Sequence, residues 1–111
     1  MVPEAELLPG TLDLLILKAV SLGAEHGYGV LLRIEQVAEA ALTVNQGTVY
    51  LCLVRLVQKK WITAAWGTSD NNRKAKFYSL TASGRKHLKA ATERWTRTIL
   101  AVNTALRAQE A

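Results

Sequence analysis

The sequence has little cysteine, little proline and no long apolar run. A single cysteine, Cys52, cannot form an internal disulfide, which excludes a disulfide scaffold and fits a reducing compartment. The most apolar stretch, Leu12 to Leu22, is interrupted by Asp13 and Lys18 and is shorter than the roughly 20 residues that a membrane-spanning helix needs. The N-terminus lacks a basic segment before an apolar stretch, so it does not resemble a secretory signal. We therefore expect a cytoplasmic protein without a membrane span.

Side chains that bind metals or catalyse reactions are also few. Cys52, His26 and His87 do not have the spacing of zinc ligands, so we expect no metal site and no cofactor. Asp13 and Glu35 form no recognisable acid and base pair with a nucleophile. The sequence therefore predicts a protein that is not an enzyme.

Charge is distributed very unevenly along the chain. Residues 1–44 hold two basic and six acidic residues, whereas residues 45–111 hold twelve basic and three acidic ones. Nine of the twelve bases lie between Arg55 and Lys89, with Asp70 the one acid among them. Such a cluster is typical of a surface that binds nucleic acid, although a solvated basic face would look the same in the sequence.

Apolar periodicity predicts three helices in the first sixty residues. The first spans about residues 11–22 and the third about residues 45–60. The second begins at the segment His26 to Gly29, where His26 is expected to cap it. In the second helix the buried stripe is expected to consist of Val30, Ile34, Val37 and Ala41. In the third helix the residues expected in the core are Val49, Tyr50, Leu53 and Leu56. Cys52 in this helix is interpreted as a buried, inert thiol, with a redox sensor as the alternative.

A β-hairpin and a long helix follow. Residues 61–66 and 76–80 alternate as strands do, and the polar turn at 67–72 lies between them. Trp61 and Trp66 are expected to pack. Thr81 resembles an N-cap, and the helix after it is predicted to reach about Ala108. Along this helix a heptad-like seam, which a small domain cannot cover alone, predicts a symmetric dimer. The seam consists of Leu88, Thr92, Trp95, Ile99, Val102 and Leu106.

Three helices followed by a polar-tipped hairpin are the order of a winged helix-turn-helix. The fold class is therefore mainly α with a small β-hairpin, α+β. We expect a winged helix-turn-helix domain over residues 8–81 and a C-terminal dimerisation helix over residues 82–109, packed with the first helix as one unit.

The architecture and the charge together predict contacts with double-stranded DNA. The helix at residues 45–60 would enter the major groove, which admits a helix, and the basic wing at residues 67–76 would follow the backbone. The residues expected at the groove are Gln46, Thr48, Leu51 and Arg55. The residues expected to neutralise phosphates are Lys59, Lys60, Arg73, Lys74 and Lys76.

Several motifs also resemble the PadR family of bacterial transcriptional regulators over about residues 8–88. They are the segments Gly10 to Leu17, His26 to Gly29, Gly47 to Tyr50 with Leu53, Arg55 and Leu56, Trp61-Ile62, and Tyr78 to Thr81 with Gly84. The resemblance implies a dimeric winged-helix repressor that binds a palindromic operator and responds to small, often aromatic, effectors. It also implies that the first helix joins the C-terminal helix at the dimer interface, where Leu12 and Ile16 are the candidates. Trp95 is the candidate effector platform, because two symmetry-related tryptophans could sandwich a flat ligand.

The third helix departs from the family pattern after Tyr50. Where the family usually has a proline, a small residue, a polar residue and a glutamate, this chain has Leu51, Cys52, Val54 and Val57. Leu51 and Val54 are placed either to contact thymine methyl groups or to be covered by protein. The alternative function is therefore a winged-helix interaction module whose apolar third helix binds another polypeptide.

Overall fold

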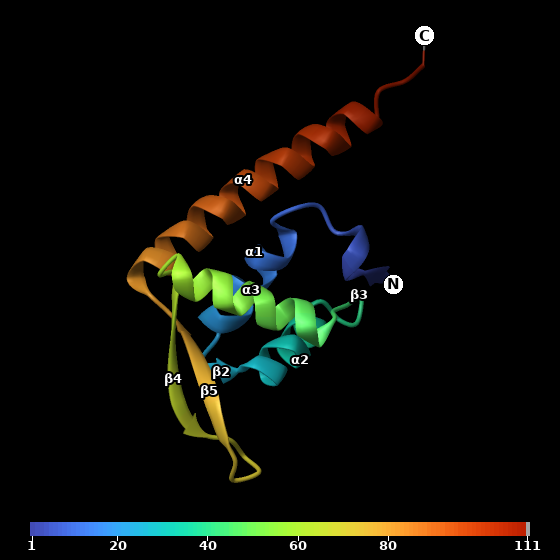
Figure 1. The fold of residues 1–111 in the computed structure, drawn as a ribbon. Coiled ribbons are helices and arrows are strands. Elements are labelled where there is room, and N and C mark those ends of the chain that lie inside the picture. The colour runs from blue at the N-terminus through green and yellow to red at the C-terminus, as the bar shows by residue number, and fades with distance from the viewer. Residues whose placement is uncertain (111) are drawn as a thin grey trace.

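The computed structural model describes residues 1–110 as one helical body with a two-stranded wing and a projecting C-terminal helix (Figure 1). The predicted helices are confirmed as α1 (Thr11–Ser21), α2 (Gly27–Val37), α3 (Gln46–Gln58) and α4 (Ala82–Leu106). The predicted hairpin is confirmed as β4 (Ile62–Thr68) and β5 (Lys74–Leu80). The α+β fold class is therefore confirmed.

Short segments that the sequence pattern did not predict complete the fold. β2 (Glu25–His26) pairs antiparallel with β5, so the wing sheet has the order β2-β5-β4. Near the N-terminus β1 (Val2–Pro3) pairs in parallel with β3 (Leu42–Thr43), and a single 3-10 turn, η1 (Glu4–Glu6), follows β1. Pairs of two residues carry no periodicity, which is why the sequence alone could not predict them.

Side-chain caps fix where three helices begin. His26 Nδ1 accepts a hydrogen bond from Gly29 N at 3.1 Å, which confirms that His26 caps α2. Asn45 Oδ1 accepts from Thr48 N at 3.1 Å, and Thr81 Oγ1 accepts from Gly84 N at 2.9 Å. Each cap satisfies a backbone N–H that has no partner inside the helix, and a cap of this kind stabilises a protein by about 1 kcal/mol.

The hydrophobic core lies where α1, α2 and α3 meet the inner ends of the wing strands. Its residues are Ile16, Leu17, Ala19, Val20, Val30, Leu31, Ile34, Val49, Cys52, Leu53, Leu56, Ile62 and Tyr78. Among the described residues of α4, Gly84 alone is buried. The core therefore belongs to the winged-helix domain, and α4 rests on its surface.

Four expectations about packing were wrong. Val37, at the end of α2, is exposed. Ala41 lies outside α2, because Glu39 and Ala40 adopt positive φ angles of 53° and 59° and turn the chain away from the helix. Leu31 fills that part of the core instead. Tyr50 and Trp66 are also exposed, because the first lies off the buried face of α3 and the second lies on the wing beyond the core.

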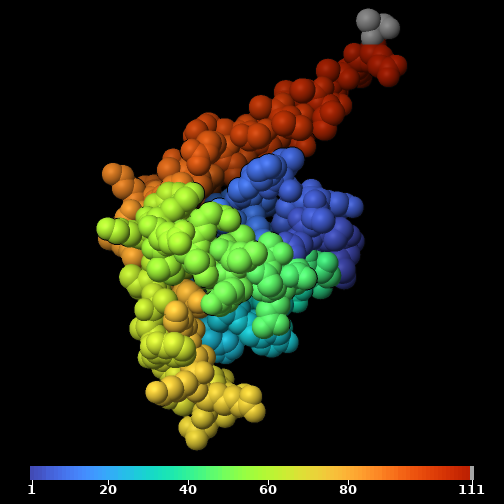
Figure 2. Space-filling model, viewed as in Figure 1, coloured from blue at the N-terminus to red at the C-terminus, as the bar shows by residue number. Residues whose placement is uncertain are grey.

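α4 extends far beyond the domain on which it begins. The described chain measures 63 by 29 by 20 Å along its principal axes, and the long dimension includes the helix (Figure 2). α4 contacts α1, and Ala91 and Trp95 line a cavity with Leu14 of that helix, whereas residues 100–110 are all exposed. No helix in residues 1–110 is long and apolar enough to cross a membrane.

Candidate DNA interface

α3 is the most exposed of the three domain helices that carry a buried face. Its core side consists of Val49, Cys52, Leu53 and Leu56. Because successive residues of a helix are about 100° apart, the opposite side is a ridge of Gly47, Leu51, Val54 and Gln58, all exposed. We call these four residues the α3 ridge. Figure 2 shows α3 and the wing on the same face of the molecule.

The N-terminus of α3 is tied to the start of the chain. Glu4 Oε1 accepts a hydrogen bond from the backbone N–H of Asn45 at 3.0 Å. Val2 N donates to Ala41 O at 2.8 Å beside the β1 and β3 pair, which holds Glu4 in place. Residues before the predicted domain start at residue 8 therefore help to position the candidate DNA-reading helix.

Arg55 of α3 is exposed and forms an ion pair with α1. Its Nη2 donates to Asp13 Oδ1 of α1 at 2.5 Å and to Cys52 Sγ at 3.4 Å. Hydrogen bonding to Asp13, followed by the attraction of that carboxylate, raises the pKa of Arg55, so the guanidinium stays charged. Arg55 therefore lies on the flank of α3 that faces α1, where its side chain is still 47% exposed. A contact with a base would require the ion pair to break.

Cys52 is a buried thiol, as expected. Burial raises its pKa, and the nearby carboxylate of Asp13 acts in the same direction. A thiol with a raised pKa is a poor nucleophile at neutral pH. Residues 1–110 also contain no group of three histidine, cysteine, aspartate or glutamate side chains close enough to bind a metal ion.

The wing presents exposed bases along its length. Trp66 pairs with Lys76 and Thr68 pairs with Lys74 across the two strands, and Arg73 follows the turn. Lys76 Nζ lies 5.5 Å from the centre of the exposed Trp66 ring, a distance at which a cation and an aromatic face attract each other. All three bases are exposed and lie within four residues of one another, so they form a continuous positive edge.

The C-terminal end of α3 carries two more exposed bases. Lys59 is its C-cap, and Lys60 adopts a positive φ of 63° that turns the chain toward β4. Lys59 Nζ lies 4.9 Å from the centre of the Trp61 ring. The predicted phosphate-binding residues are therefore exposed in two groups, one at the end of α3 and one on the wing.

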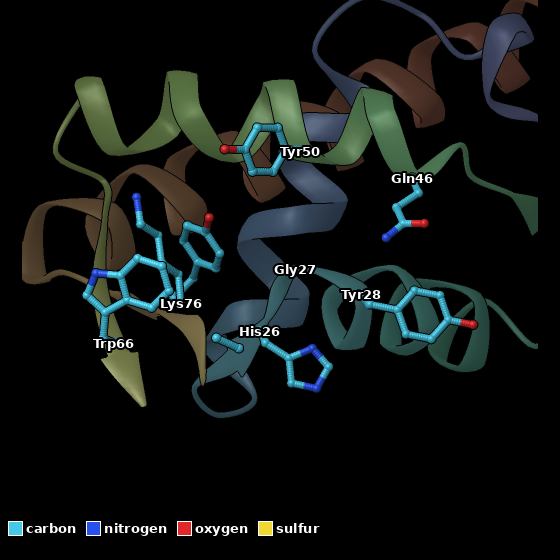
Figure 3. Close-up of a pocket in the computed structure, with 9 residues that line it drawn as sticks. His26, Gly27, Tyr28, Gln46, Tyr50, Trp66 and Lys76 are labelled. Carbon is cyan, nitrogen blue, oxygen red and sulfur yellow. The ribbon is translucent and has the colours of Figure 1, made fainter. Parts of the chain in front are cut away.

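A cleft of about 500 Å³ separates α3 from the wing and the start of α2 (Figure 3). Gln46 and Tyr50 line it from α3, Trp66 and Lys76 line it from the wing, and His26 marks the start of α2. All three tyrosines of the chain contribute to its lining. Burial, followed by the proximity of Tyr50, raises the pKa of Tyr78, so that hydroxyl stays protonated at neutral pH. The sequence did not predict this cleft, because Tyr50 was expected in the core and is instead exposed.

The predicted dimer residues fall into two groups. Ile16 is fully buried in its own domain, so it cannot contact a partner and its assignment to the interface is wrong. Leu12 and Leu88 are partly buried against the same core. Thr92 is exposed, and its hydroxyl donates to Leu88 O at 2.7 Å within α4. The remaining seam residues, Trp95, Ile99, Val102 and Leu106, lie farther along α4, and the last two are exposed.

Trp95 lies beside a second cavity. This cavity, of about 290 Å³, is lined by Leu8 and Leu14 from the N-terminal side and by Ala91, Arg94 and Trp95 from α4. Trp95 is 37% exposed, so one part of its ring is covered by its own chain and another part remains available. The ring can therefore contact both this cavity and a neighbouring molecule.

An aromatic stack connects α4 to the winged helix. The rings of Trp61 and His87 lie 3.6 Å apart at an angle of 11°. Burial, and then the positive charges of Arg94 and Lys59, lower the pKa of His87, whereas Asp13 acts weakly in the opposite direction. The stack is therefore more stable when His87 is neutral.

This lowered pKa gives the stability of the fold a defined pH dependence. In the unfolded chain His87 is expected to titrate near its ordinary pKa of about 6.5, so the unfolded state binds a proton more readily than the folded state. The free energy of unfolding is therefore highest above that pH and should decrease as the pH falls through the lower pKa of the folded state. We expect urea unfolding to show a smaller acid-induced loss in His87→Phe, which keeps the aromatic ring without the titrating group. Equal losses in both proteins would contradict this account.

The order of three helices and a wing, with an exposed third helix beside a basic hairpin, defines a winged helix-turn-helix protein. Residues 16–90 match the transcriptional regulator PadR-like family, and the chain belongs to that family. The resemblance to the PadR family that the sequence motifs indicated is therefore confirmed. The protein belongs to a family of transcriptional regulators and not to a family of enzymes.

Solved structures of related proteins have the same fold. A PadR-like transcriptional regulator from Bacillus cereus is 25% identical, covers 90% of this chain and 95% of its own, and superposes with a TM-score of 0.77. A PadR family transcription regulator from Clostridium difficile is 27% identical, covers 87% of this chain and 99% of its own, and superposes with a TM-score of 0.75.

A relative found by sequence, a protein of uncharacterised function from Lysinibacillus sphaericus, is 25% identical over 92 residues, which are 83% of this chain and 84% of that protein.

Proposed function

We propose that this protein is a dimeric repressor that binds a palindromic operator through α3 and the wing. The observation that carries the proposal is the position of five exposed bases beside the outer face of α3. Lys59 and Lys60 lie at one end of that helix, and Arg73, Lys74 and Lys76 lie on the hairpin beside it. Two such groups can neutralise phosphates on either side of a groove that α3 enters.

The residues of the interface have distinct roles in this proposal. Gln46 and Thr48 in the first turn of α3 and Leu51 on the ridge face base edges, and the five bases contact phosphates. Arg55 is assigned to the ion pair with Asp13 instead of a base. The sign of regulation, repression, follows from the family resemblance.

Dimerisation through α4 would supply the two-fold symmetry that a palindrome requires. The exposed seam residues beyond Trp95 support this step, because apolar side chains at heptad spacing pair readily with a second copy. In such a dimer the partly exposed Trp95 rings are candidates for a site that binds a flat aromatic effector. A ligand held there would change the angle between the two domains and release the operator.

The salt dependence of binding tests the interface. We expect the affinity for DNA from the protein's own upstream region to fall steeply with salt, by about 0.9 in log affinity per log unit of salt for each neutralised phosphate. Lys74→Ala should weaken binding to all sequences alike. It should also reduce the slope of log affinity against log salt concentration by about 0.9 for each Lys74 that contacts a phosphate. Fluorescence anisotropy across a salt series measures both quantities.

Lys18→Ala is the matched control, because Lys18 is an exposed lysine on α1 and belongs neither to α3 nor to the wing. It should leave the slope unchanged. A slope that does not change in Lys74→Ala would show that the wing does not contact phosphates.

The exposed apolar ridge on α3 supports a second candidate function, a module that binds another polypeptide. Leu51 is 67% exposed, which is unusual for a leucine in the middle of a helix. A hydrophobic protein contact would depend weakly on salt. The absence of any sequence-preferring DNA complex at low and moderate salt would favour this second function.

A further inference from the structure

We infer that α3 selects A·T base pairs by packing Leu51 and Val54 against thymine methyl groups, an inference that rests on the proposed binding of DNA. The ridge that faces away from the core holds four residues, and none of them is charged. Leu51 is 67% and Val54 is 39% exposed, and Gly47 adds no side chain at the N-terminal end. The part of α3 that reaches deepest into a groove is therefore aliphatic.

The ion pair of Arg55 disfavours the obvious alternative, a guanine contact, because that contact would require the pair with Asp13 to break. Arginine that donates two hydrogen bonds to guanine is the commonest specific contact in the major groove. Arg55 is the one basic residue inside α3, and its guanidinium is held by Asp13 and Cys52 on the flank that faces α1. The ridge consequently has no cationic donor to offer to a guanine.

Two exposed glutamines of α3 favour the same base pair. Gln58 completes the ridge, and Gln46 lies in the first turn of the helix, where it lines the cleft beside Tyr28 of α2 (Figure 3). A glutamine amide can donate and accept at the same time, which matches N6 and N7 of adenine. The adenine that a glutamine amide can recognise and the methyl group of thymine belong to the same base pair, so the glutamine and aliphatic side chains both favour A·T.

The spacing on the helix agrees with contacts to neighbouring base pairs. Leu51 and Val54 are three residues apart, so their positions differ by about 4.5 Å along the helix axis. Successive bases on one strand are about 3.4 Å apart. Both side chains can therefore reach methyl groups on adjacent or overlapping steps of one half-site.

Charge decides between DNA and a protein as the occupant of this ridge. Lys59 and Lys60 flank it at one end and the wing bases lie beside it. The carboxylates of Glu4 and Asp13 that contact α3 are already bonded, to Asn45 N and to Arg55. A polyanion is complementary to an aliphatic strip with a basic border. An apolar surface of another protein would gain nothing from that border.

Uracil substitution tests the inference without altering the protein, because uracil is thymine without the C5 methyl group. The full-length protein is first used to select operators from random duplexes, and each thymine is then replaced singly by uracil. Burial of one methyl group is worth about 0.8 kcal/mol, so loss of a contacted methyl should weaken binding about four-fold. At least one thymine in each half-site should show this loss.

The variants Leu51→Ala and Val54→Ala test which side chain contacts each thymine methyl group. Each should weaken binding to the thymine operator and should no longer distinguish thymine from uracil at one position. Leu22→Ala is the matched control, because Leu22 is also an exposed leucine but lies at the end of α1. It should retain the full difference between thymine and uracil.

The possible outcomes separate the inference from the proposed function. If the protein prefers its operator yet no uracil substitution changes affinity, the inference fails and operator binding stands. If the largest losses come from replaced guanines, and Arg55→Ala abolishes them, the inference also fails. If no duplex is preferred over random DNA at any salt concentration, both the inference and the proposed function fail.

Discussion

Replacing Gly84 by alanine is expected to lower the free energy of unfolding by about 3 kcal/mol, through overpacking against a backbone that cannot move. Gly84 lies in the first turn of α4, and a Cβ built there would approach Trp61 O to 1.8 Å. The same carbonyl oxygen accepts hydrogen bonds from Thr81 N at 3.0 Å and from Thr81 Oγ1 at 3.0 Å. The added methyl group would therefore push α4 away from the position that the cap and the stack of Trp61 on His87 define.

Gly27→Ala is the matched control for this substitution. Gly27 begins α2, and a Cβ there would lie 3.7 Å from Leu53 Cδ1, which is an ordinary contact. Alanine is favoured over glycine in helices by about 1 kcal/mol, so this variant should be neutral or slightly more stable. Urea unfolding of both variants measures the difference. Equal stability of the two would show that α4 is not seated tightly on the domain.

Replacing Val102 by glutamate is expected to dissociate the proposed dimer, with an increase in its dissociation constant of at least about 100-fold. Val102 is exposed on the seam of α4, beyond the part of the helix that contacts its own domain. In a two-fold dimer the substitution would appear twice at one interface, and an unpaired buried carboxylate costs several kcal/mol. A loss of 1.4 kcal/mol corresponds to a tenfold change in the constant. Sedimentation equilibrium over a range of protein concentrations measures the change.

Thr104→Glu controls for the effect of a new charge on α4 itself. Thr104 is exposed, lies two residues from Val102, and is about 200° away around the helix. Both substitutions add a negative charge near the C-terminal end of the helix, where it is unfavourable by similar amounts. Thr104→Glu should remain a dimer. Dissociation of both variants, or of neither, would contradict an interface along the seam.

Local features of the fold were predictable because they depend on neighbours in the sequence. His26 and Thr81 could be identified as caps, since a cap depends on the side chain and on the next three residues. The change of period from 3.6 to 2 after Trp61 located the hairpin for the same reason.

Features that depend on distant residues were not predictable. The partner of Arg55 is 42 residues earlier in the chain, so its spacing within α3 could not show that Asp13 would hold it. α1 is apolar on several sides, and only the packed structure shows that Ile16 faces its own core. Tyr50 lies next to Val49 in sequence but about 100° away on the helix, which exposes its ring to the cleft.

The account as a whole depends on two chains that present α3 and the wing to one duplex. The most direct test is the mass of the complex with a selected operator, measured by analytical ultracentrifugation for the wild-type protein and for Val102→Glu. The account predicts two chains on each duplex for the wild-type protein and a much weaker complex for the variant. A single chain on each duplex with undiminished affinity in both proteins would contradict it.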